Sequence, residues 1–283
     1  MTAGVPAAPD PAQVRIDVQR ALAEDLGAGD ASASLVAEDA RARAHVLCRE
    51  QAVLAGQAWF DACLRQLDPD IAIDWHHRDG AALSAGTRLC TIEGRARAML
   101  SGERTGLNFL QTLSATATVT ARHVAAVAGT RTRILDTRKT LPGLRVAQKY
   151  AVRCGGGSNH RMGLFDAVLV KENHISAAGS IVAAVQRARR LHPDLLLEIE
   201  VENLDELERA LSAGVDRVML DEFDDATLSQ ALACIDGRAE VEVSGSVSLE
   251  RLRHLATLGI DYVSIGALTK NIRAVDLSMR FDD

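Results

Sequence analysis

Six charged or small residues follow short apolar segments in the second half of the chain, at intervals of 21 to 33 residues. They are Arg138, Lys171, Glu200, Asp221, Ser244 and Gly266. Each interval is about the length of one strand and one helix, so parallel strands would bring these residues to one edge of a sheet. Because α/β proteins bind ligands at the carboxyl ends of their strands, we expect the functional site at this edge.

Each position also has an ordinary structural interpretation. A single Arg or Lys after a strand is usually a solvated loop residue. Asp221 could cap the helix that follows it, and Ser244, Gly245 and Ser246 could form a simple turn. Only their coincidence at one edge favours a function.

Acidic groups would face cationic groups in such a site. Glu198, Glu200 and Glu202 share one strand parity in LEIEVEN, so alternation alone does not select the one that faces a ligand. With Asp221, a glutamate here could bind ribose hydroxyls, coordinate Mg²⁺ or stabilise an oxocarbenium-like centre.

The segment CGGGSNHRMGLFDAVLVKENH contains three consecutive glycines, residues 155–157, followed by His160 and Arg161. Consecutive glycines suit a backbone that approaches another group closely or a turn that exposes its amides; a flexible linker is the simpler alternative. No GK[ST] follows them, so this is not a Walker motif.

The basic residues near these segments would form a positive pocket in a chain of net charge −6. They are Arg138, Lys139, His160, Arg161 and Lys171, which include two of only four lysines among 32 basic residues. Guanidinium groups match carboxylates and phosphates bidentately. A cationic wall opposite an acidic wall favours transfer of a sugar between anionic groups.

Residues after about 130 predict the elements that would position this site. Short apolar strands alternate with helices of ten or more residues; the strands are RILDT, AVLV, LLLEIEV, RVML, VEVS and YVSI. Because these strands are too apolar to have a solvated face, we expect a parallel sheet covered by helices. Six strands favour a small, incomplete α/β barrel. A doubly wound open sheet is the alternative, but no GxGxxG follows the first strand.

The chain before residue 130 has a mixed pattern that predicts helices packed on an antiparallel sheet. Helices are expected over 14–26, 56–67 and 101–128, and strands over 41–50, 71–77 and 87–94.

Composition excludes several classes of protein. No apolar run reaches the roughly 20 residues of a membrane helix, and the first residues lack the pattern of a signal peptide. Five widely spaced cysteines without a CxxC pair disfavour both a disulfide framework and a zinc site, which fits a cytoplasmic protein. The negative charge and 3% aromatic content disfavour nucleic acid as a partner.

The chain resembles the quinolinate phosphoribosyltransferase family over nearly its whole length. The matching segments are EDLGAGD, ERTGLNFLQTLSATAT, DTRKTLPGLR, CGGGSNHRMGLFDAVLVKENH, EIEVEN, MLDEF, VEVSGSV, IGALTK and AVDLSMRF. The resemblance implies an N-terminal α/β sandwich, residues 1–129 completed by the C-terminal strand in 273–283, and an incomplete α/β barrel, residues 130–272. It also implies a homo-oligomer, a dimer or a dimer-based hexamer, with sites shared between subunits.

The resemblance further implies a role for each site residue. The residues that would hold quinolinate are Arg104 (from the neighbouring subunit), Arg138, His160, Arg161 and Lys171. Lys139 would lie between the two substrates, and Glu200 and Asp221 near the ribose and Mg²⁺ of phosphoribosyl pyrophosphate (PRPP); these three are the expected catalytic residues. The expected contacts to the PRPP phosphates are Ser244, Gly245, Ser246 and Gly266.

The function implied is transfer of the phosphoribosyl group of PRPP to quinolinate with loss of CO₂, in de novo NAD biosynthesis. A related phosphoribosyltransferase with another acceptor, such as the paralogue associated with molybdenum-transport genes, is the nearest alternative. A non-catalytic barrel that binds an anionic metabolite would gain nothing from Glu200 and Asp221. A structural oligomer subunit would leave the polar strand ends unexplained.

Overall fold

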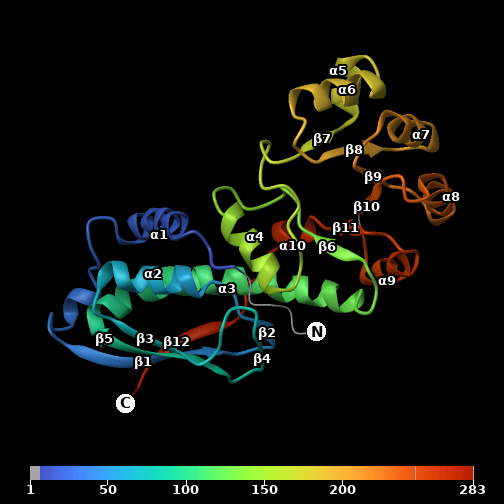
Figure 1. Ribbon diagram of the computed structural model, residues 1–283. Coiled ribbons are helices and arrows are strands. Elements are labelled where there is room, and N and C mark those ends of the chain that lie inside the picture. The colour runs from blue at the N-terminus through green and yellow to red at the C-terminus, as the bar shows by residue number, and fades with distance from the viewer. Residues whose placement is uncertain (1–6, 246, 283) are drawn as a thin grey trace. The chain divides into compact units, whose positions relative to one another are not determined.

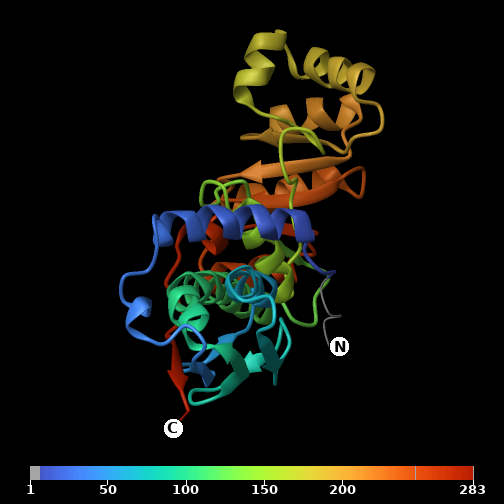
Figure 2. The same ribbon diagram turned by 90° about the vertical axis from the view of Figure 1, so that its left-hand side faces the viewer.

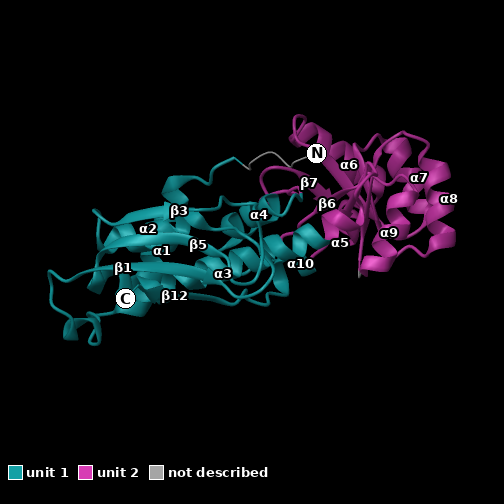
Figure 3. Cartoon of the chain, turned by 90° about the horizontal axis from the view of Figure 1, so that it is seen from below, with its two compact units in different colours: residues 1–122, 139–157, 267–283 teal, residues 123–138, 158–266 magenta. Residues whose placement is uncertain are grey.

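The computed structural model describes residues 7–245 and 247–282, which divide into two compact units (Figure 3). Unit 1 contains the described residues up to 122, together with 139–157 and those from 267 onwards. Unit 2 contains residues 123–138 and 158–266. Residues 139–157 thus group with the N-terminal part of the chain. The domain boundaries expected from the sequence, residues 1–129 with 273–283 and residues 130–272, remain a prediction.

Unit 1 is built on a four-stranded antiparallel sheet of order β12-β1-β5-β3. Its strands are β1 (Arg41–Cys48), β3 (Ala72–Trp75), β5 (Arg88–Arg95) and β12 (Leu277–Phe281). The C-terminal strand β12 pairs with β1, which confirms that the end of the chain completes this sheet. Two strands of two residues each, β2 (Ala52–Val53) and β4 (Ala82–Leu83), pair separately and were not predicted.

Three helices cover this part of unit 1: α1 (Pro11–Leu26), α2 (Gln57–Leu67) and α3 (Ala96–Ala126). A short 3-10 helix (Ala33–Leu35) follows α1. The sheet and α2 and α3 share a core that includes Val46, Phe60, Ile92 and Leu107. Figures 1 and 2 show α1 running across α2. The long helix α3 begins five residues before the predicted start at residue 101.

Unit 2 is a six-stranded parallel sheet of order β6-β11-β10-β9-β8-β7. Its strands are β6 (Arg133–Leu135), β7 (Val168–Val170), β8 (Leu197–Val201), β9 (Arg217–Asp221), β10 (Glu240–Ser244) and β11 (Tyr262–Ser264). The first strand neighbours the last, and the others follow in chain order. This is the cyclic order of a barrel left open between β6 and β7, so the predicted incomplete α/β barrel is confirmed. A doubly wound sheet would change direction within its strand order.

Helices lie along one side of the strands β7 to β11 (Figure 1). They are α5 (Glu172–Ala178), α6 (Ile181–Leu191), α7 (Leu204–Ala213), α8 (Asp225–Ile235) and α9 (Leu249–Thr257), while α4 (Arg145–Cys154) and α10 (Ala267–Lys270) belong to unit 1. Side chains of Ser180, Asn203, Asp224 and Ser248 cap α6 to α9 by accepting a backbone N–H. Because Asp224 caps α8, Asp221 is not needed as a cap.

The two faces of the parallel sheet differ in polarity. Side chains of one parity, such as Ile199, Val218 and Val243, are apolar and buried on the face that the helices cover. On the opposite face the buried residues include Glu198, Arg217 and Glu242. No solvated face was expected, and these residues are buried, but the face carries charged groups that the apolar pattern did not predict.

The three glycines of residues 155–157 follow helix α4 and allow a close approach to α3. A Cβ on Gly155 would lie 2.4 Å from the backbone oxygen of Ala117 and 2.7 Å from Thr120 Cβ. The amides of Gly155, Gly156 and Gly157 donate to backbone oxygens within α4. The segment therefore serves helix packing and has no spare amide for an anion.

We expect Gly155→Ala to destabilise the protein by about 2 to 3 kcal/mol, because the added methyl group meets backbone that cannot move aside. Gly155 has a φ of −77°, so its cost would be steric alone. Gly129→Ala is the control: its φ is +83° and nothing lies within 4 Å of the added Cβ, so about 1 kcal/mol of backbone strain is expected. Urea unfolding measures the loss in free energy of unfolding for both variants. A loss for Gly155→Ala that is smaller than that for Gly129→Ala would contradict the close packing of Gly155 against α3.

Candidate active site

The carboxyl ends of the strands in unit 2 gather most of the polar residues predicted from the sequence; we call this edge the rim. Lys171 follows β7, Glu200 lies on β8, and Asp221 and Ser244 end β9 and β10 as register partners. Lys171 Nζ forms an ion pair with Glu200 Oε2. A cationic and an acidic residue predicted for different substrates thus neutralise each other here.

Depth along β8 separates the three glutamates that the sequence could not distinguish. Glu198 has no exposed surface, the Glu200 side chain is 14% exposed, and Glu202 is exposed. Glu200 therefore lies at the depth where a side chain can reach a ligand in the rim.

Two arginines follow neighbouring segments at the rim: Arg138 follows β6, and Arg161 follows Ser158, which forms a parallel bridge with Leu135 of β6. Arg138 and Arg161 are both half-buried. Burial and the positive charge of Arg138 lower the pKa of Arg161, while the negative charge of Glu198 opposes this effect. The two side chains form a cationic wall. An anion with two carboxylates would neutralise the positive charge of their guanidinium groups.

The segment that carries Arg161 is fixed by side chains. Asp136, at the end of β6, accepts the His160 N–H at 3.0 Å and the Asn159 Nδ2–H at 2.5 Å. Asp166 accepts the backbone N–H groups of Met162 and Gly163. Residues 159–163 are therefore held on both sides.

A hollow of about 200 Å³ with an acidic lining lies beside Glu200, between the ends of β8 and α5. It is lined by Glu172, Ile175, Ser176, Glu200, Glu202 and Glu206. The charge of Glu172 is the largest cause of a raised pKa at Glu202, followed by burial and the charges of Glu206 and Asp221. Such excess negative charge favours a divalent cation with oxygen ligands.

The turn after β10 brings acidic and small residues together. Gly245 has a φ of +128°, and a Cβ there would lie 3.0 Å from Glu222 Oε1. Glu222 itself has a left-handed φ of 54°, which is uncommon outside glycine and often marks functional turns. Gly266, half-buried, follows β11. The predicted contact Ser246 lies outside the described residues.

Lys139 belongs to unit 1, where its backbone is fixed although its side chain is exposed. Thr269 Oγ1 donates to the Lys139 carbonyl at 2.9 Å. Gln148 links Thr269 to Leu141, because it accepts the Leu141 N–H at 2.7 Å and donates to the Thr269 carbonyl at 2.8 Å. Gln148 and Thr269 are fully buried, so they fix the loop that begins at Lys139.

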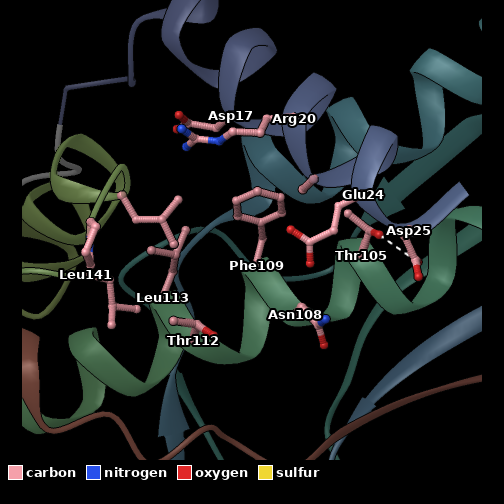
Figure 4. A pocket seen from close by; sticks show the side chains of 13 residues that line it. Asp17, Arg20, Glu24, Asp25, Thr105, Asn108, Phe109, Thr112, Leu113 and Leu141 are labelled. Carbon is pink, nitrogen blue, oxygen red and sulfur yellow. Dashed lines mark hydrogen bonds between the residues drawn. The ribbon is translucent and has the colours of Figure 1, made fainter. Parts of the chain in front are cut away.

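Arg104 also belongs to unit 1 and is exposed on α3. The next residue, Thr105, lines a hollow of about 520 Å³ between α1, α3 and residues 141–144 (Figure 4). Figure 4 shows Arg20, Glu24 and Phe109 around this hollow. Its lining contains none of the predicted site residues, so we do not assign the site to it.

Two buried glutamates beside the predicted site residue His160 were not themselves predicted as part of the site. His160 Nε2 lies 2.9 Å from Glu198 Oε2 and 3.5 Å from Glu242 Oε2, on the polar face of the sheet. Burial raises the pKa of Glu198 to about 7 and that of Glu242 to about 8, the latter also through the charge of Glu198. The alternating polar residues of VEVS were the available signal for Glu242.

The structure also bears on the expectations for disulfides and for membrane-spanning helices. All five cysteines are free, and Cys154 beside the glycines is buried. None of the helices in residues 7–245 and 247–282 is long and apolar enough to cross a membrane.

Comparison with protein families finds two matches that together cover most of the chain. Residues 30–114 match the N-terminal domain of quinolinate phosphoribosyl transferase, and residues 116–280 match its C-terminal domain.

Individual proteins agree with these matches. The carboxylating nicotinate-nucleotide pyrophosphorylase of Mycobacterium leprae is 40% identical over 275 residues, which cover 94% of this chain and 96% of the relative. A solved nicotinate-nucleotide pyrophosphorylase from Francisella tularensis has a TM-score of 0.92 and 44% identity, with 100% of both chains covered. NadC from Streptococcus pyogenes has a TM-score of 0.94 and 38% identity, covering 98% of this chain and 100% of that one.

We expect Glu242→Gln to make the protein less sensitive to rising pH. Between the ordinary pKa of 4.5 and about 8, folded Glu242 keeps a proton that the unfolded chain releases. Its contribution to the free energy of unfolding therefore falls by up to about 1.4 kcal/mol per pH unit as the pH rises. Urea unfolding at pH 5, 6.5 and 8 should show a stabilising effect of the substitution that grows with pH.

The control for this prediction is Glu240→Gln, on the same strand and face but with a side chain that is 46% exposed. An effect of Glu242→Gln that is the same at all three pH values would contradict the raised pKa.

Proposed function

The chain belongs to the quinolinate phosphoribosyltransferase family, and we propose that it transfers the phosphoribosyl group of PRPP to quinolinate. The products are nicotinate mononucleotide, CO₂ and pyrophosphate, so the protein is a decarboxylating pentosyltransferase of NAD biosynthesis. The observation that carries this proposal is the rim of unit 2, where a cationic pair, Arg138 and Arg161, lies at the same edge as Glu200 and Asp221.

Quinolinate would bind to the cationic part of the rim. Its two carboxylates match the guanidinium groups of Arg138 and Arg161, which can each bind a carboxylate through two N–H groups. Lys171 adds a third charge once the substrate competes with Glu200 for its ammonium group. Arg104 and His160 are proposed to complete the pocket, and Lys139 to lie between the two substrates, as the family resemblance implies.

PRPP would bind to the acidic part of the rim with Mg²⁺. Glu200 and Asp221 offer oxygen ligands, and the acidic hollow beside Glu200 supports binding of a divalent cation. Mg²⁺ usually takes one or two protein carboxylates and fills its remaining positions with water and substrate phosphates, which fits two carboxylates rather than a closed cage. When bound, Mg²⁺ would neutralise charge on the leaving pyrophosphate.

The phosphates of PRPP would reach the turns after β10 and β11. Ser244 can donate its hydroxyl, and Gly245 and Gly266 have no side chain of their own between the backbone and a phosphate. Ser246 is proposed for the same region on the family resemblance alone.

The chemistry follows from this arrangement. The quinolinate nitrogen attacks the anomeric carbon of PRPP, and the bond to pyrophosphate breaks. Glu200 and Asp221 stabilise the positive charge that develops on the sugar. The alkylated ring then accepts the electron pair of the adjacent C–CO₂ bond, CO₂ leaves, and the ring carbon takes up a proton. Each step depends mainly on positioning, with Lys139 proposed to lie between the two substrates.

We also propose a homo-oligomer, a dimer or a dimer-based hexamer, in which Arg104 of one subunit reaches the quinolinate site of its neighbour. Support comes from the segment after Arg161, where Leu164 and Phe165 are 73% and 74% exposed. Asp166 fixes the backbone of this segment at Met162 and Gly163, and a pair of exposed apolar side chains suits a protein interface. A cytoplasmic location is proposed on the five free cysteines.

A coupled assay with PRPP and Mg²⁺ tests the reaction. Quinolinate and nicotinate are offered separately, and both nicotinate mononucleotide and CO₂ are quantified. We expect turnover with quinolinate alone and one CO₂ for each mononucleotide. If folded and oligomeric protein gives no product from quinolinate, the protein has the family fold but uses a different acceptor substrate.

Removal of a cationic side chain should abolish most of the activity. We expect Arg161→Ala and Lys139→Ala each to lower kcat/KM by about 100-fold or more, on the order of 3 kcal/mol of transition-state stabilisation. Arg209→Ala is the control, because Arg209 is exposed and pairs with Asp205 within α7. Near-normal activity in both site variants would contradict the assignment.

Sharing of the site between subunits predicts complementation. Arg104→Ala and Arg161→Ala chains are expected to be nearly inactive alone. Co-expressed with different tags, half of the dimers should be mixed, and each mixed dimer has one intact site of two. About a quarter of the wild-type activity should therefore return. Mixed dimers without activity would show that Arg104 does not act across the interface.

A further inference from the structure

Asp136 is a buried acidic residue at the end of β6 that the proposed chemistry does not use. It has no exposed surface, and a buried carboxylate is costly unless polar groups bind it. Both of its oxygens accept hydrogen bonds: Oδ1 from the His160 backbone N–H at 3.0 Å, and Oδ2 from Asn159 Nδ2 at 2.5 Å. Both donors belong to the segment that leads to Arg161, so the carboxylate joins this segment to β6.

The backbone of the same segment runs parallel to the end of β6. Ser158 forms a parallel bridge with Leu135, and the Asp136 N–H donates to the Ser158 carbonyl at 3.2 Å. Arg138 lies three residues after Leu135. Arg161 likewise lies three residues after Ser158. The two arginines therefore occupy equivalent positions beyond one bridge between two parallel segments.

The side chain of Asp136 extends this pairing beyond the strand. β6 ends at Leu135, and residues 136–138 belong to no helix or strand. The bonds from Asn159 and His160 to the carboxylate continue the connection two residues past Ser158. Paired strands lie about 4.8 Å apart, so the two segments should keep about this spacing up to the residue before Arg161.

This spacing matters because the two segments carry like charges. Burial and the positive charge of Arg138 lower the pKa of Arg161, so the two guanidinium groups interact although no strand pairing holds their own backbones. Like charges in a partly buried place repel and would separate if their segments were free to move. The bonds to Asp136 oppose such a movement.

We infer that Asp136 is a positioning residue that sets the spacing of Arg138 and Arg161, and with it the preference of the site for a ligand whose two carboxylates are adjacent. Asp136 acts through the two arginines and not by contact with the ligand. The inference rests on the proposed function, because it takes quinolinate as the ligand of this pair.

Calorimetric titration with two pyridine dicarboxylates of equal charge tests the inference. The carboxylates are on adjacent ring carbons in quinolinate and on opposite sides of the ring in pyridine-2,5-dicarboxylate. We expect the wild type to bind quinolinate at least about tenfold more tightly than the second ligand, and Asp136→Ala to reduce this preference to about threefold or less.

Asp136→Asn tests whether hydrogen bonds carry the effect. The variant keeps an oxygen that can accept the His160 N–H, and its amide can donate to Asn159 once the Asn159 amide group is turned. We therefore expect it to restore the preference for quinolinate to within about twofold of the wild type.

Steady-state kinetics separate positioning from a general loss of structure. We expect Asp136→Ala to raise the KM for quinolinate about tenfold or more and the KM for PRPP by less than about twofold. Asp261→Ala is the matched control, since Asp261 also accepts the backbone N–H of a neighbouring strand, that of Val241 at 3.0 Å, but at the amino ends of the strands. It should leave the preference and both KM values unchanged.

Asn159→Ala decides the question if Asp136→Ala does not fold, because it removes one donor and leaves β6 and Asp136 intact. We expect it to lower the preference for quinolinate about threefold. An unchanged preference in either variant, or an equal loss in Asp261→Ala, would overturn the inference and leave the proposed function intact. A wild type that binds both dicarboxylates equally would overturn the inference together with the proposed quinolinate site.

Discussion

The partly buried positive charge of Arg138 and Arg161 is the constraint on which the remainder of the proposed site depends, because burial and the charge of Arg138 both lower the pKa of Arg161. A pocket for a dianion must hold cations close together before the substrate arrives, in a partly buried place where charges interact strongly. The structure opposes this repulsion with acidic residues at two depths. Glu200 pairs with Lys171 at the rim, and the negative charge of the buried Glu198 partly offsets the lowered pKa of Arg161. One strand, β8, thus supplies both a proposed substrate contact and a buried counter-charge.

Most of the fold could be predicted from the sequence because its elements differ in hydrophobic period. Four of the six strands of unit 2 lie within predicted segments, and β9 and β10 each extend one residue beyond theirs. The strand order then decided between a barrel and a doubly wound sheet. Strand order depends on contacts between distant segments, which local periodicity does not contain. The strands β2 and β4 have two residues each, too few to show any alternation. The start of α3 was missed because residues 96–100 continue directly from strand β5.

The site was less predictable than the fold. The positions after each strand identified the rim, but alternation along LEIEVEN indicates a face and not a depth, so it could not separate Glu198 from Glu200. Glu242 was overlooked because VEVS was interpreted as an apolar strand. Residues 155–157 pointed to an anion or a close approach, and only the distance to Ala117 shows that helix packing requires them. Roles that depend on a second subunit, such as that of Arg104, leave no pattern within one chain.

The central claim is that the cationic wall selects a ligand with two neighbouring carboxylates, and calorimetric titration of the assembled protein tests it most directly. Quinolinate, nicotinate and pyridine-2-carboxylate are titrated separately under the same conditions. Two guanidinium groups that each bind one carboxylate predict that quinolinate binds at least about tenfold more tightly than either monoacid. Equal affinity for quinolinate and nicotinate would contradict the account, because Arg138 and Arg161 would then not act together on one substrate.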